Sequence, residues 1–81
     1  MRTSEFRERW QARLSELDPE ARWGLFSAER DARNWRIFIR HVVDGIPMTI
    51  LAVAHDITPV RIRQIIVAMD RRLVQRLGSP E

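Results

Sequence analysis

The sequence contains no cysteine and no tyrosine, and it has few histidines, glycines and prolines. Without cysteine there is no disulfide framework, no thiolate metal site and no cysteine nucleophile. The histidines, His41 and His55, are too few for a structural zinc site. No apolar run approaches the roughly 20 residues needed to cross a bilayer, and the first residues lack the apolar stretch of a signal peptide. We therefore expect a cytoplasmic protein with no metal, no cofactor and no membrane partner.

The short length limits the protein to one small domain. The 81 residues can bury only a modest core, and the 44% apolar and 31% charged composition is typical of a folded domain. Three glycines and four prolines leave little room for long loops or a glycine-rich phosphate cradle. No Ser-His-Asp order and no metal triad is present, and the glutamates lie among arginines at helical spacings, as surface pairs do. An enzyme is not expected.

The positive charge is unevenly distributed. All 14 basic residues are arginine, which hardly titrates, so the pI of 11.2 alone indicates little about nucleic acid. Residues 1–40 mix nine arginines with seven acids, a pattern typical of solvated surface. Residues 57–80 hold five arginines against one acid, Asp70. The basic excess therefore lies in the C-terminal third.

Apolar residues recur with helical spacing along the whole chain, and no segment alternates as a strand would. The pattern predicts an all-α fold of about five helices, over residues 5–17, 19–26, 28–43, 47–54 and 58–77. The predicted N-caps are Ser4, Asp18, Ser27 and Thr58, and Gly45 is suited to a left-handed C-cap. Residues 1–45 then form a helical scaffold and residues 46–77 a helix-turn-helix. The expected core comprises the stripe Phe6, Trp10, Leu14 and Leu17, the stripe Ala32, Trp35, Phe38, Ile39 and Val42, and also Trp23 and Phe26.

Two helices joined by a few residues, the second long and basic, are typical of a helix-turn-helix. Ala52 supplies the small residue where the two helices cross, and Asp56 occupies the left-handed turn position that usually favours glycine. His55 lies at a normally apolar position, where a packed, neutral histidine is expected. The apolar clamp between the helices comprises Met48, Leu51, Ile57, Ile62 and Ile65.

The outer face of the last helix carries side chains of the types that can read DNA bases. Arginine can bond guanine, glutamine can bond adenine, and valine can pack on a thymine methyl group. Thr49 and the cap Thr58 lie at helix starts, where backbone phosphates are bound. Arg36 and Arg40 could reach further phosphates or could be solvated surface charge. The predicted DNA-binding residues are Thr49, Thr58, Val60, Arg61, Arg63, Gln64, Val67 and Arg71.

Residues 43–73 resemble two known groups of DNA-binding proteins. The segment 43–47 (Val-Asp-Gly-Ile-Pro), followed by Ala52, Thr58, Ile62 and Gln64, resembles the DNA-binding segment of KorA/TrfB-type repressors of conjugative plasmids. This resemblance implies that Gln64 reads a base, and Pro59, which stands where that family has an arginine, implies a different operator. Residues 56–65 also resemble the −35-reading helix-turn-helix of primary sigma factors. That resemblance implies contacts from Arg63 and Gln64.

The sequence therefore predicts a sequence-specific transcriptional repressor from a plasmid or phage, associated with the bacterial nucleoid. Its partner is double-stranded DNA, bound at a palindromic operator near a promoter by a homodimer. The dimer contact is expected at Leu73, Val74 and Leu77 or at the exposed edge of the Phe6–Trp10–Leu14 stripe. One alternative is a sigma-like or RNA-polymerase-binding regulator that acts through protein contacts. The other is a helical interaction module whose basic helix is only solvated.

Overall fold

The computed structural model describes residues 3–26 and 28–78, with the side chains of residues 3–6, 29 and 30 left out of the description. Every regular element in these ranges is a helix, which confirms the predicted all-α class. The helices are α1 (Thr3–Ser15), α2 (Pro19–Gly24), α3 (Glu29–Val42), α4 (Met48–His55) and α5 (Pro59–Leu77). No helix in the described ranges is long and apolar enough to cross a membrane.

The helix boundaries follow local capping chemistry. Asp18 caps α2, because its Oδ1 accepts the Ala21 N–H at 2.8 Å, and Gly45 adopts the left-handed conformation (φ 76°) after α3. Two of the predicted N-caps are not observed as caps. Ser4 lies inside α1, since that helix already includes Thr3, and Ser27 lies outside the described residues. The N-cap of α3 is Ala28, which makes no side-chain cap bond.

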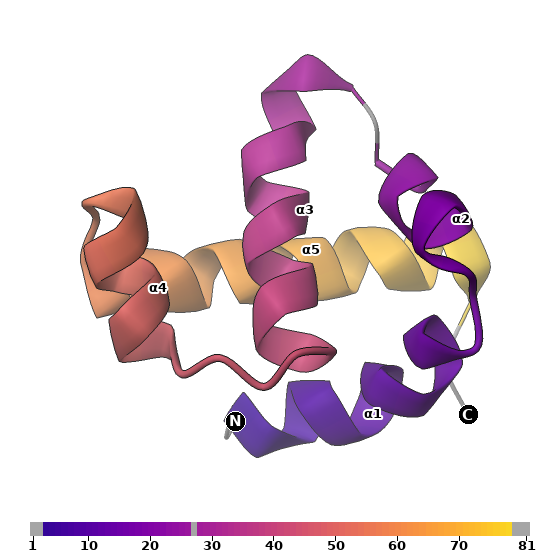
Figure 1. Ribbon diagram of the computed structural model, residues 1–81, viewed down its shortest axis with the longest axis horizontal. Coiled ribbons are helices and arrows are strands. Elements are labelled where there is room, and N and C mark those ends of the chain that lie inside the picture. The colour runs from indigo at the N-terminus through magenta and orange to yellow at the C-terminus, as the bar shows by residue number, and fades with distance from the viewer. Residues whose placement is uncertain (1–2, 27, 79–81) are drawn as a thin grey trace.

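Helix α3 crosses α5 at the centre of the molecule, with α1 and α4 packed beside it (Figure 1). Of the predicted core residues of α1 and α3, Ala32 is partly buried and six are buried: Trp10, Leu14, Trp35, Phe38, Ile39 and Val42. Ile37 was not part of the predicted stripe and is also fully buried, because α3 is covered by three helices. Burial of these side chains is the main source of stability in so small a domain.

Trp23 was predicted to be in the core, and that prediction is wrong. Its side chain is 41% exposed, and α2 buries no residue. This short helix is held mainly by hydrogen bonds. The Arg22 side chain donates to the carbonyls of Leu14 and Leu17, and Trp35 Nε1 donates to the Arg22 carbonyl at 3.0 Å.

Two acidic side chains turn inward and join helices. Asp70 of α5 accepts bonds from Trp10 Nε1 at 2.6 Å and from Arg9 at 3.1 and 3.2 Å, which ties α1 to α5. Asp31 of α3 binds Arg72 of α5 at 2.6 and 2.9 Å. Hydrogen bonding to Asp31 raises the pKa of Arg72. Each carboxylate therefore neutralises an arginine at a helix–helix contact.

Candidate nucleic-acid interface

A tight turn orients α5 against α4. Asp56 adopts the predicted left-handed conformation (φ 54°, ψ 45°), and its N–H bonds the carbonyls at the end of α4. The Ile57 N–H bonds the Ala52 carbonyl at 3.0 Å. Thr58 then caps α5, since its Oγ1 accepts the Arg61 N–H at 3.1 Å, and Pro59 is the first helical residue. The turn therefore fixes where the long helix begins and in which direction it runs.

The clamp residues lie between the two helices as predicted. Leu51, Ala52, Ile62 and Ile65 are buried, and the small Ala52 side chain is only 4% exposed. Met48 and Ile57 are partly buried against the same core. Because these positions face inward, the opposite positions of α5 must face outward.

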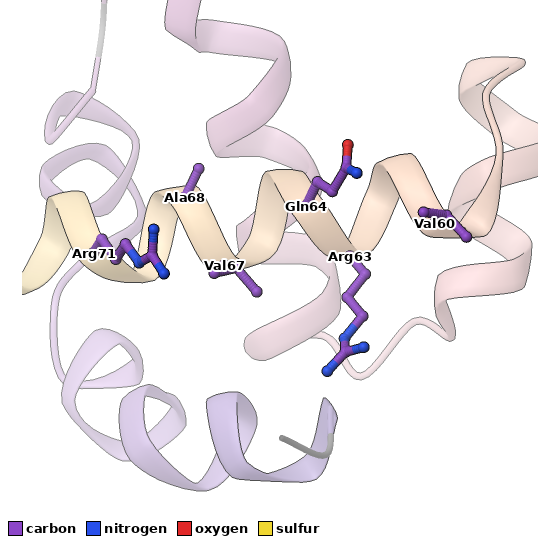
Figure 2. Close-up of a pocket in the computed structure, with 6 residues that line it drawn as sticks. All are labelled: Val60, Arg63, Gln64, Val67, Ala68 and Arg71. Atoms are coloured by element: carbon purple, nitrogen blue, oxygen red, sulfur yellow. The ribbon is translucent and has the colours of Figure 1, made fainter.

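The outward face of α5 forms a shallow open hollow of about 440 Å³. Figure 2 shows its lining residues projecting from one side of this helix. Val60 is 68% exposed, Val67 is partly buried, and the polar members of the set are exposed. Five of the eight predicted DNA-binding residues line the hollow. The lining residues are Val60, Arg63, Gln64, Val67, Ala68 and Arg71.

The other predicted DNA-binding residues lie beside the hollow. Arg61 is exposed, and its Nη1 donates to Gln64 Oε1 at a long 3.5 Å, so a DNA base can replace this weak bond. Thr58 is exposed, but its hydroxyl is engaged as the helix cap. Thr49 is exposed at the second residue of α4. Ala68 also lines the hollow, although it was not among the predicted DNA-binding residues.

The charge of the outward face is purely basic because α5 turns its one acid away. Asp70 is 6% exposed and is held by α1. Two of the five arginines of α5 also point away from this face. Arg72 pairs with Asp31, and the guanidinium groups of Arg72 and Arg76 lie 4.8 and 4.6 Å from the ring centroid of Phe26. The basic excess that the sequence indicated is therefore carried outward by Arg61, Arg63 and Arg71.

The two histidines are packed side chains. Burial, followed by the charges of Arg40, Arg33 and Arg36, lowers the pKa of His55, which favours the expected neutral form. Its Nε2 is buried without a hydrogen-bond partner in the described part of the chain. His41 is buried near the end of α3, and its Nδ1 lies 2.9 Å from the Ile46 carbonyl. That carbonyl belongs to the loop that follows α3.

Little of either predicted dimer surface is exposed among the described residues. Trp10, Leu14 and Leu73 are fully buried, because α1 and α3 pack on one another and on α5. The side chain of Phe6 lies outside the described set. Val74 remains 37% exposed, which leaves only a small patch at the end of α5.

Two surface features were missed. On α4, Ile50 is 57% and Val53 is 82% exposed. On α3, Arg33 lies exposed beside Arg36 and Arg40. A helical-wheel projection of α3 and of α4, with the core residues on one side, places Arg33, Ile50 and Val53 on the outward sides of these helices.

The chain matches no protein-family model, no curated protein and no solved structure. The function proposed below therefore rests on the outward face of α5 and on the turn that presents it.

Proposed function

We propose that this protein is a transcriptional repressor that binds duplex DNA by inserting the outward face of α5 into the major groove. The observation that carries the proposal is this face: an exposed row of arginine, glutamine and small apolar side chains without an acid, on a helix of 19 residues. Such a helix is about 28 Å long. The major groove is wide enough for it and displays a distinct donor and acceptor pattern for each base pair.

The side chains on the outward face of α5 suit different chemical groups of DNA. Arg63 and Gln64 can form bidentate bonds to guanine and adenine, while Val60 and Val67 can contact thymine methyl groups. Exposed valines are unfavourable on a purely solvated helix, so a groove gives Val60 an apolar partner. Arg71 lies farthest along the face and suits a phosphate. One such helix reads only a few base pairs, so a homodimer on a palindrome with half-sites one turn apart completes the proposal.

The test is a salt-titrated selection from random duplex DNA, followed by sequencing of the retained molecules. A palindromic motif with strong salt dependence is the expected result. Retention without any motif would leave only attraction between arginine and phosphate and would refute sequence-specific repression.

Single substitutions then locate the interface. Gln64→Ala or Arg63→Ala should weaken binding to the selected duplex by about 1–3 kcal/mol, and Arg71→Ala should lower the salt slope by about 1. Gln11→Ala is the matched control, because Gln11 is an exposed glutamine on α1. Equal affinities for the Gln64 and Gln11 variants would exclude α5 as the reading helix.

A second function is favoured by a different observation, the exposed Ile50 and Val53 of α4. Neighbouring apolar side chains on a surface helix are typical of a protein-binding site, and RNA polymerase is the partner expected for a sigma-like regulator. In that case Ile50→Ser/Val53→Ser should abolish polymerase binding in a pull-down, while Gln64→Ala should leave regulation unchanged.

A further inference from the structure

A second row of positive charge lies on α3. Arg33, Arg36 and Arg40 are all exposed and stand at i, i+3 and i+7, so they form one stripe along the helix. Trp35, Phe38, Ile39 and Val42 occupy the side that packs into the core. The arginine stripe is therefore the side of α3 turned away from the core.

The stripe is left without a neutralising carboxylate from the described residues. Asp31, the described acid of α3, is turned inward to Arg72. The two side-chain hydrogen bonds of Arg33 that the structure records both go to Oδ1 of the neutral Asn34, at 3.4 Å. Burial is the main reason that the pKa of His55 is lowered, and the three arginines add to the effect, so their charges converge on the end of α4.

The α3 stripe and the outward face of α5 each lie on the side of their helix that is turned away from the core. The core sides of α3 and α5 pack against each other, so the exposed sides of the two helices face away from each other. Figure 1 looks down the shortest axis, with α3 in front of α5, and the molecule measures 20 Å along that direction. A straight duplex that lies against the outward face of α5 is therefore separated from the front side of α3 by the thickness of the molecule.

We propose that the α3 stripe binds the phosphates of a second DNA duplex, so that one molecule bridges two duplexes. The proposal rests on the proposed function, since α5 must hold the first duplex. Arg33 and Arg40 are about 10 Å apart along the axis, over which each strand of B-DNA places about three phosphates. The stripe has no side chain placed to read bases, so this contact is independent of sequence.

Charge complementarity favours DNA over a protein partner. Protein interfaces have an apolar centre, and none of the exposed large apolar side chains of the described residues lies on α3. Repulsion between two bound duplexes is also weak, because the 20 Å thickness of the molecule exceeds the Debye length of about 8 Å at physiological salt.

The experiment immobilises the selected operator duplex, saturates it with the protein, and measures retention of a labelled duplex that lacks the operator. Operator binding is measured first. Three phosphate contacts predict that the affinity for the labelled duplex falls about 40-fold between 50 and 200 mM salt. Arg33→Gln/Arg36→Gln/Arg40→Gln should abolish retention of the labelled duplex and leave operator binding similar to that of a charge-matched control.

The control is Gln11→Glu/Ala12→Glu/Ser15→Glu, which lowers the net charge by the same amount through exposed positions of α1. It should keep retention of the labelled duplex. Circular dichroism checks that both variants fold. Retention that survives the arginine substitutions would overturn the proposal, as would capture of labelled polyglutamate in preference to DNA. If the protein holds the operator but retains no second duplex, bridging fails and repression stands. If it holds no duplex, both fail.

Discussion

Replacing Asp70 should be among the most damaging single changes in the protein, although no core apolar contact is removed. Asp70 is 6% exposed and accepts a 2.6 Å bond from Trp10 Nε1, whose ring is fully buried. In Asp70→Ala this indole N–H loses its acceptor in a dry environment, at a cost of about 1–3 kcal/mol. The Arg9 side chain is 32% exposed and can turn to water, so the lost ion pair adds at most about 1 kcal/mol.

The sum is a loss of about 1–4 kcal/mol for Asp70→Ala, which corresponds to a fall in Tm on the order of 15 °C in a domain of this size. Asp70→Asn keeps an acceptor for the indole and should cost only about 1 kcal/mol. Thermal unfolding followed by circular dichroism measures both, and Arg9→Gln serves as the control for the ion pair. If Asp70→Asn proved as costly as Asp70→Ala, the charge and not the indole bond would dominate, and the reasoning would be wrong.

Three further substitutions test the α4–α5 crossing, the N-cap of α5 and the pKa of His55. Ala52→Leu should destabilise the fold by about 1–3 kcal/mol in urea unfolding, because the α4–α5 crossing has no space for a larger side chain. Thr58→Ala should cost about 1 kcal/mol by the same assay, whereas Thr49→Ala, an exposed helical position without a cap bond, should be near neutral. Because the pKa of His55 is lowered in the folded state, the unfolded chain binds the proton more readily. Stability should therefore fall as the pH drops below about 6.5, and His55→Gln should remove that part of the pH dependence.

Sequence reasoning succeeded where the structure is decided locally. Asp56, Thr58 and Pro59 determine the turn and the start of α5 through capping bonds that involve only neighbouring residues. Helical spacing alone then places Val60, Gln64, Val67 and Arg71 on one side of the helix. For the same reason the composition of the outward face could be predicted, although its DNA partner stays a prediction.

The failures concern contacts between distant segments. Trp23 was expected in the core because large aromatic residues are usually buried. Helix α2 is instead held by hydrogen bonds, and the Trp23 ring is exposed. The N-terminal stripe was expected to offer an exposed edge, but Trp10 and Leu14 are fully enclosed. Neither result follows from periodicity, because both depend on which helices cross and at which residues.

Charge segregation links the stability of this fold to its surface. Asp31 and Asp70 bind arginines that belong to other helices, Arg72 and Arg9, so each pair both joins two helices and removes an acid from the surface. Exposed arginines remain on the outward sides of α3 and α5, and Asp31 and Asp70 do not face them. Breaking either ion pair would weaken a contact between two helices. It would also return a carboxylate to the surface and so lower the positive potential of a basic face. The same two ion pairs that hold the bundle together therefore also keep Asp31 and Asp70 away from both basic faces.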